Sequence, residues 1–221
     1  MADVDTLLSD IRAALEGVEE KIRGHPYLVA LEKGEIKKEK LTIFAGEQYH
    51  IISSDLRSVA LLLSRMGDGA GLDFFWMLLQ GEVEGFQALL RFASSLGMSE
   101  EGLNAYETLA RAQAYKAYMA WLCLYGTEAE AAAAFLVNFP AWGANCGRMS
   151  EALKRNYGFR NDEVAFFDLF SAPAADFEKK AMAVVDRGLS RGVAPLAIET
   201  AARLLQDYEF LFWDTVWKAS S

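Results

Sequence analysis

Apolar residues recur at helical spacing along almost the whole of this 221-residue chain, and signals for β-strands are nearly absent. The longest such stretch runs from about Glu39 to Met66, where apolar residues are spaced by threes, fours and sevens. That spacing places them on one face of a long helix, whereas a half-buried strand would alternate at every second residue. They are Leu41, Phe44, Ile51, Ile52, Val59, Leu62 and Leu63. Because only four prolines interrupt the chain, we expect an all-α fold.

Short breaks divide the chain into about seven to eight helices. Ser99 and Thr127 each precede glutamates in the pattern of an N-terminal helix cap, and Pro173 and Pro195 suit the first turn of a helix. The expected helices cover approximately residues 4–23, 39–66, 72–96, 99–125, 128–157, 161–170, 173–187 and 195–217. No low-complexity linker, internal repeat or shift in composition separates them. We therefore expect a single helical domain over residues 1–221, in which neighbouring helices pack side by side.

The composition narrows the classes of function. The chain is 52% hydrophobic and 24% charged, which is typical of a globular protein with a substantial core. Its net charge is -9 and its basic residues form only short runs, which disfavours nucleic acid and anionic membranes as partners. No apolar run reaches transmembrane length, no basic signal-peptide segment precedes the first helix, and two cysteines cannot build a disulfide framework. We therefore expect a cytoplasmic protein.

One stripe of the long helix is polar. Glu47, His50 and Ser54 stand at i, i+3 and i+7, so a carboxylate and one of only two histidines share a helix face. This stripe is either a polar patch paired with a neighbouring helix or the floor of a ligand pocket. In the second case Glu47 and His50 would supply acid and base groups.

Two later carboxylates could join that pocket. Asp176 and Glu209 lie on separate helices and could converge with Glu47, and carboxylates that share a buried site raise the pKa of one of them. The alternatives are a helix-start position for Asp176, where the helix dipole stabilises a carboxylate, and a surface salt bridge for Glu209. Aromatic neighbours on both sides of Glu209 favour its burial.

An amide and several rings complete the candidate pocket. Asn138 follows four successive alanines, at positions 131–134, and a buried amide there needs a hydrogen-bond partner. The rings are expected in the core and, as a set, could form a wall on which a flat heterocycle stacks. They are Tyr49, Phe135, Phe139, Trp142 and Trp213. Cys123 and Cys146 are expected to be small core residues.

Three groups of residues carry a resemblance to a known family. The first part of the chain has His25-Pro26-Tyr27, Gly34, Glu47 with Tyr49, and Ser64-Arg65-Met66-Gly67-Asp68. The middle has Phe139-Pro140-Ala141-Trp142, and the end has Glu209-x-x-x-Trp213 within an aromatic segment. Together they resemble the TenA/PqqC superfamily, which shares the fold of haem oxygenase. The resemblance spans most of the chain and implies a haem-oxygenase-like helical bundle that forms a homodimer.

The branches of that superfamily differ in chemistry. In TenA-type thiaminases a nucleophilic Cys follows the proline of the fifth helix and an Asp stands on the second, but this chain has Ala141 and Gln48 there and keeps only Glu209. In the di-iron branch, which includes the chlamydial death-domain-associating protein, Glu47 would match the first ligand, while Ser54 and Lys179 replace expected histidines and only Asp176 of the late motif remains. The resemblance therefore implies neither the thiaminase nucleophile nor the family metal pair.

The PqqC-like branch lines a closed, metal-free pocket with His, Tyr, Arg and Lys side chains, which Tyr49, His50, Arg57 and Lys179 match weakly. We predict a TenA/PqqC-like protein that binds a small aromatic or heterocyclic metabolite, as an enzyme of thiamin-type or quinone-type cofactor metabolism, and we expect no metal or cofactor of its own. The expected catalytic residues are Glu47, His50 and Glu209, and the expected ligand-binding residues are Tyr49, Asn138, Trp142, Asp176 and Trp213. The alternatives are a non-catalytic binding or interaction module on the same fold, and an atypical metal-dependent oxidase that uses the carboxylates and His50.

Overall fold

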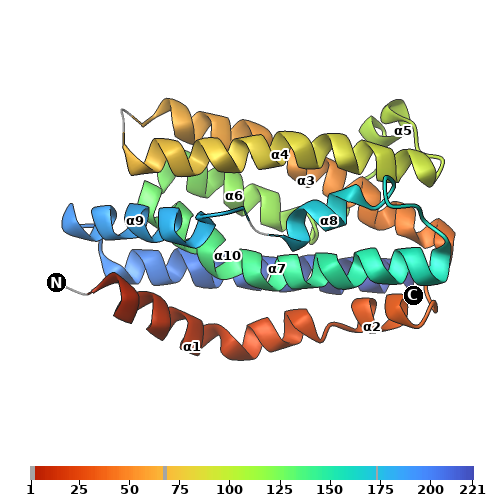
Figure 1. Ribbon diagram of the computed structural model, residues 1–221, viewed down its shortest axis with the longest axis horizontal. Helices are drawn as coiled ribbons and strands as arrows, with labels where there is room; N and C mark the ends of the chain where they lie inside the picture. Colours follow the sequence, from red (N-terminus) through yellow and green to blue (C-terminus); the bar gives the residue numbers. More distant parts are fainter. Residues whose placement is uncertain (1–2, 67–68, 173) are drawn as a thin grey trace.

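The computed structural model describes residues 3–66, 69–172 and 174–221, and its regular structure within these ranges is helical (Figure 1). The helices are α1 (Val4–Arg23), α2 (Pro26–Glu32), the 3₁₀ turn η1 (Lys38–Lys40), α3 (Leu41–Ser64), α4 (Ala70–Ser95), α5 (Glu100–Asn104), α6 (Ala114–Tyr125), α7 (Glu128–Tyr157), α8 (Ala165–Ser171), α9 (Phe177–Ser190) and α10 (Pro195–Ser220). The expected all-α fold is confirmed. Pro173 and the Gly67-Asp68 part of the early motif lie outside the described residues.

Helix α7 lies at the centre of the arrangement. It packs against α10, α9, α8, α2 and α1, while α3 and α4 form a second layer that α6, α8 and α9 connect to the first (Figure 1). The four alanines at 131–134 are all fully buried. Because four successive residues point to every side of a helix, this part of α7 has neighbours all around it, and its small side chains let their backbones come close.

The ends of α7 follow from its sequence. Thr127 accepts a hydrogen bond from the backbone N–H of Glu130, whose carboxylate accepts from the backbone N–H of Thr127 (2.8 Å), so the predicted cap is a reciprocal capping box. The helix ends at Gly158, which adopts a left-handed conformation with φ of 72°. Ser99 caps α5 in a similar way, by accepting from the backbone N–H of Gly102 (3.1 Å).

The structure differs from the expected helices at several places. Helices α8 and α9 begin at Ala165 and Phe177, about four residues after the expected starts at 161 and 173. A short helix, α2, follows His25 in the stretch between the expected helices 4–23 and 39–66, and it starts with Pro26 in the first turn. The segment 99–125, expected as one helix, is divided into α5 and α6 by the irregular residues 105–113. Within that segment the backbone N–H of Leu109 donates to the carboxylate of Glu47 (2.8 Å). A buried acid on α3 thus takes a main-chain donor that a continuous helix would have used itself.

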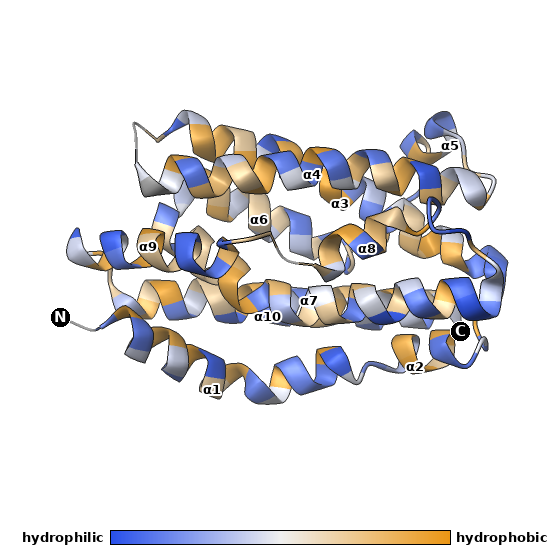
Figure 2. Cartoon of the chain, in the orientation of Figure 1, coloured by the Kyte–Doolittle hydropathy of each residue, from blue (hydrophilic) through white to orange (hydrophobic). Residues whose placement is uncertain are grey.

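Hydrophobic residues on α1 face the bundle and its hydrophilic residues face outward (Figure 2), whereas α4 also exposes Leu72, Trp76 and Val83. At the centre, the fully buried Phe44 of α3 lies 6.1 Å from the ring of Trp213 and 6.4 Å from that of Trp142. These rings join α3 to α10 and α7 in one core. Within the described part of the chain, no helix combines the length and the hydropathy that crossing a membrane would need.

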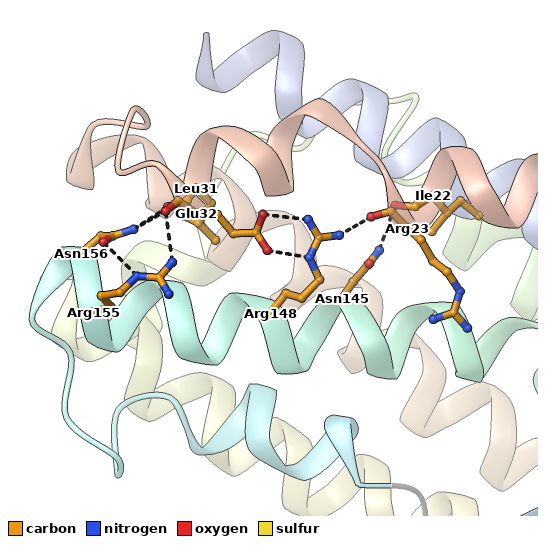
Figure 3. Close-up of polar contacts among 8 residues, drawn as sticks. All are labelled: Ile22, Arg23, Leu31, Glu32, Asn145, Arg148, Arg155 and Asn156. Carbon is orange, nitrogen blue, oxygen red and sulfur yellow. Dashed lines mark hydrogen bonds and ion pairs between the residues drawn. The ribbon is translucent and has the colours of Figure 1, made fainter.

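A row of polar side chains on α7 binds the C-terminal ends of α1 and α2 (Figure 3). Arg148 makes a two-pronged pair with the carboxylate of Glu32 (2.6 and 2.9 Å) and also donates to the carbonyl oxygen of Arg23. On either side, Asn145 donates to the carbonyl of Ile22 (3.1 Å) and Asn156 to that of Glu32 (2.8 Å). These bonds satisfy the carbonyl groups at two helix ends, which have no partner within their own helix.

Replacing Arg148 with alanine should lower the free energy of unfolding by about 1–3 kcal/mol, because it removes a bidentate charge-assisted pair and a partner of the Arg23 carbonyl. The measurement is urea unfolding followed by circular dichroism. Arg203→Ala is the matched control: Arg203 pairs with Asp207 on an exposed helix face, and its loss should cost less than about 0.5 kcal/mol. Equal losses in the two variants would contradict the fastening role of Arg148.

Candidate functional site

A small cavity of about 40 Å³ lies inside the bundle, between α3, α4, α6, α7, α8 and α10. Its wall combines carboxylate, amide and hydroxyl groups with five phenylalanine or tryptophan rings and one isoleucine. The lining residues are Gln48, Ile51, Asp55, Glu82, Tyr115, Phe135, Asn138, Phe139, Trp142, Phe170, Glu209 and Phe212. Polar groups set among aromatic rings in a buried hollow are typical of a small-molecule site.

Glu209 is the centre of a buried hydrogen-bond network in this cavity. It is 2% exposed, and its two carboxylate oxygens accept from the indole N–H of Trp213 (3.1 Å) and from the amide of Asn138. The Asn138 amide also donates to the side-chain oxygen of Gln206 (3.0 Å), and its own oxygen accepts from the hydroxyl of Tyr115 (3.3 Å). Residues from α6, α7 and α10 therefore hold the carboxyl group of Glu209 in one orientation.

Burial shifts the acid groups of the cavity toward their protonated forms. Desolvation raises the pKa of Glu209 to about 7, although the hydrogen bonds from Trp213 and Asn138 act in the opposite direction. Desolvation also raises the pKa of Glu82 to about 7. The pKa of Asp55 lies well above its usual value, mainly because the group is buried and secondly because the charge of Glu82 is near. The positive charge of Lys116 lowers this pKa and so offsets part of the rise. Near neutral pH the cavity can therefore both donate and accept protons.

Three of the predicted site residues line this cavity: Glu209, Asn138 and Trp142. Trp213 is fully buried and acts through its hydrogen bond to Glu209. Asp176 does not line the cavity. It is exposed at the start of α9, with φ of 65°, and borders an open groove next to the cavity.

The predicted residues Glu47, Tyr49 and His50 point to another part of the protein. Glu47 binds the segment 105–113, the hydroxyl of Tyr49 donates to Asn104 (3.0 Å), and Nε2 of His50 lies 3.0 Å from the carbonyl oxygen of Leu103. The residues of α3 that line the cavity are Gln48, Ile51 and Asp55, each one position after a member of the predicted stripe Glu47, His50 and Ser54. Since one residue turns a helix by about 100°, the cavity lies against a different face of α3 from the predicted one. The catalytic and ligand-binding roles of these three residues stay predictions, and their observed contacts are structural.

Sequence reasoning did not single out Asp55, Glu82, Tyr115 or Phe170. A signal for Asp55 existed, because this acid lies in the apolar stripe between Ile52 and Val59. Tyr115 and Phe170 carry no such signal, since aromatic residues are common in any core.

The cavity adjoins an open groove of about 1200 Å³ that runs between α4, α7 and α9. Glu82, Phe139 and Phe170 line both spaces, so their side chains form the wall between them. The ring of Phe170 fits there because Gly85 has no side chain: a Cβ atom on it would lie 2.9 Å from that ring. A Cβ atom on Gly143 would lie 2.8 Å from the carbonyl oxygen of Phe170.

The described residues offer neither a reactive cysteine nor a cluster of metal ligands. Ala141, at the position of the thiaminase cysteine, is fully buried in the core. Burial raises the pKa of the Cys123 thiol to about 12 and that of Cys146 well above its usual range, so both stay protonated. Among residues 3–66, 69–172 and 174–221, no three His, Cys, Asp or Glu side chains come together in a way that could hold a metal ion.

The pH dependence of stability should reveal the raised pKa of Glu209. Below pH 4.5 this carboxyl is protonated in both the folded and the unfolded chain, whereas from there up to about pH 7 only the unfolded chain gives up the proton. Stability therefore falls as the pH rises through this window, by about 3 kcal/mol for this group. In Glu209→Gln, which cannot ionise, the fall between these pH values should be smaller by that amount in urea unfolding. The exposed Glu199→Gln on the same helix should keep the wild-type slope, and an unchanged slope in Glu209→Gln would contradict the assignment.

Glu47→Gln tests whether Glu47 is structural or catalytic. The substitution removes a charged acceptor from the backbone of Leu109 and the side chain of Gln113, so the free energy of unfolding should fall by about 1–3 kcal/mol. Any turnover that the protein shows should keep its rate. Lost turnover at unchanged stability would instead establish the predicted catalytic role.

Several solved structures share this fold. A TenA homologue from Pseudomonas syringae pv. tomato str. DC3000 is 11% identical, with 98% of this chain and 96% of that chain covered and a TM-score of 0.82. A domain of unknown function with a heme oxygenase-like fold from Shewanella denitrificans OS217 is 17% identical, with 99% and 93% covered and a TM-score of 0.74. A putative TenA-like thiaminase from Sulfolobus solfataricus P2 is 12% identical, with 100% and 98% covered and a TM-score of 0.70.

At these identities the likeness shows the fold, and it confirms the expected haem-oxygenase-like bundle. No curated protein matches the chain. The model of the TENA/THI-4/PQQC family matches residues 12–219. Because that match spans nearly the whole sequence, the chain belongs to the TENA/THI-4/PQQC family.

Proposed function

We propose that this protein binds a small aromatic or heterocyclic metabolite in the cavity around Glu209 and acts on it by acid–base chemistry. The observation that carries the proposal is the state of Glu209: a fully buried carboxyl group with a pKa of about 7, fixed by two N–H donors and facing a wall of rings. Raised pKa values of this kind are typical of groups that transfer protons at neutral pH.

Each group of the site has a role in this scheme. Protonated Glu209 donates its proton to a basic ring nitrogen or a leaving group of the ligand, and the resulting carboxylate is stabilised by the N–H groups of Asn138 and Trp213. The hydroxyl of Tyr115 keeps the amide of Asn138 in the orientation that presents its NH₂ group to Glu209. The rings of Trp142 and Phe212, 6.5 Å apart and steeply inclined, offer a face and an edge to a flat ligand.

Family membership supports a substrate from cofactor metabolism, of the thiamin or the quinone type. The relative from Sulfolobus solfataricus is described as a putative TenA-like thiaminase. This chain has Ala141 where the nucleophilic cysteine of that branch is expected, and its two cysteines stay protonated. The proposed chemistry therefore uses the Glu209 carboxyl without a covalent thiol intermediate. The homodimer and the cytoplasmic location expected from the sequence stay predictions.

The ligand needs more room than the cavity now offers. A space of about 40 Å³ holds only a water molecule or two, whereas a benzene ring has been accommodated in a cavity of about 150 Å³ in another protein. The missing volume lies directly behind Phe139 and Phe170, in the adjoining groove. We infer that these two rings turn aside when a ligand enters, which joins the groove to the cavity.

The test is a panel of amino-substituted pyrimidines, thiazoles and bicyclic quinones, screened by thermal shift and then by mass spectrometry for products. At least one compound should raise the melting temperature and be converted. Glu209→Gln should lower kcat by about 100-fold or more, and the wild-type rate should fall above about pH 7, where the acid form of Glu209 is lost.

Glu199→Gln, on an exposed face of the same helix, is the control and should keep the wild-type rate. Binding without any product would favour the non-catalytic binding module instead. An absence of binding across the panel would contradict the proposal as a whole.

A further inference from the structure

Two carboxyl groups of the cavity have no part in the scheme above. Asp55 projects from α3 and Glu82 from α4, and both line the cavity that contains Glu209. Asp55 is 6% exposed, and the charge of Glu82 acts directly on it. Neighbouring helices thus bring two acids together at a place where a hydrophobic pair would pack without electrostatic cost.

One oxygen of this pair lacks a partner. Within the described part of the chain, Oδ1 of Asp55 is buried and accepts no hydrogen bond. A buried polar atom without a partner costs about 1–3 kcal/mol, and such atoms are rare in folded proteins. By contrast, the carboxylate oxygens of Glu209 are both occupied by N–H donors. Asp55, which lines the cavity, therefore has an oxygen that no described protein group occupies.

The charges around the cavity are all of one sign. Its described lining includes Asp55, Glu82 and Glu209 but no lysine, arginine or histidine. The basic group with an effect on Asp55 is Lys116 of α6, which lies outside that lining and offsets burial only in part. Burial, followed by the charges of all three carboxyl groups, raises the pKa of Tyr115, so its side chain stays a neutral hydroxyl. A positively charged guest would relieve the repulsion between these acids.

We propose that Asp55 and Glu82 form a subsite for a cationic nitrogen group, such as an amidinium or a protonated amine, on the ring that the cavity binds. The proposal rests on the proposed function and specifies the class of its ligand. Two or more N–H donors on one flat group would pair with Oδ1 of Asp55 and the carboxylate of Glu82, and charge-assisted bonds of this kind are the stronger ones. The rings of Phe139 and Trp142 would add cation–π attraction.

The position of Glu82 also gives the ligand a direction of entry. Glu82 borders both the groove and the cavity, so of the three acids that line the cavity it is the first that a ligand entering between Phe139 and Phe170 would meet. The cationic end would therefore be held at the α3–α4 side, between the two helices that carry the acid pair.

Benzamidine and benzamide provide a matched pair of probes, because they differ chiefly in the charge of one flat substituent. Titration calorimetry at about pH 8.5, above the pKa of Glu82, with EDTA present, should show benzamidine binding to the wild type about tenfold or more tighter than benzamide. In Asp55→Asn and in Glu82→Gln this preference should shrink to about twofold or less, with benzamide binding unchanged. Asp73→Asn, an exposed acid on the same helix as Glu82, should keep the full preference.

Equal binding of both probes by the wild type, a preference that survives Asp55→Asn, or binding of neither probe would overturn the subsite. The two variants should fold, which circular dichroism checks, because each removes one of two neighbouring carboxyl charges. If benzamide alone binds, the subsite fails while the cavity function stands. If the preference depends on Asp55 but Glu209→Gln leaves turnover of every panel compound unchanged, the subsite stands and the acid–base function fails.

Discussion

The close packing of α7 against its neighbours is the constraint from which the rest of the structure follows. Four successive buried alanines leave no side of that helix for solvent, so other helices surround it and their axes come near. Beyond the alanines the side chains become larger, beginning at Phe135. The cavity lies next to this part of α7, where Phe135, Asn138, Phe139 and Trp142 line it.

A bundle of this kind tolerates carboxyl groups in its interior only in particular forms. Glu209 is accommodated because burial favours its neutral form and because Asn138 and Trp213 supply N–H donors when it ionises. Glu47 is accommodated differently, by accepting hydrogen bonds from the backbone of Leu109 and from Gln113. The first arrangement faces a cavity and the second holds the segment 105–113, so two buried acids in one protein have different surroundings.

The helical pattern was predictable because each long helix buries one continuous apolar stripe, and the spacing of apolar residues along the sequence reveals such a stripe. The cap at Thr127 was predictable for the same reason. The face of α3 that lines the cavity was not, because its whole middle section is buried and polar residues occur on two of its sides. A choice between Glu47 and Asp55 requires knowing which neighbour lies against each.

The break between α5 and α6 is a second feature that the local sequence does not predict. No glycine or proline occurs in residues 105–113, so local propensity gives no reason for a helix to stop there. The contact that the segment makes instead is with a distant residue: the backbone N–H of Leu109 donates to the carboxylate of Glu47, 62 positions away in the chain. That Glu209, Asn138 and Trp142 line one cavity agrees with the sequence because each is a polar or large side chain in a segment otherwise suited to burial.

The two glycines that contact Phe170, Gly85 and Gly143, act on different parts of it: one accommodates its ring and the other its backbone. Gly143 sets how near the α8 backbone comes to α7, and Gly85 leaves a recess in α4 for whatever side chain residue 170 carries. The backbone spacing is therefore independent of the ring itself. A smaller residue at this one position would remove one of the three side chains that separate the inner space from the outer one, while Gly143 would keep α8 in place.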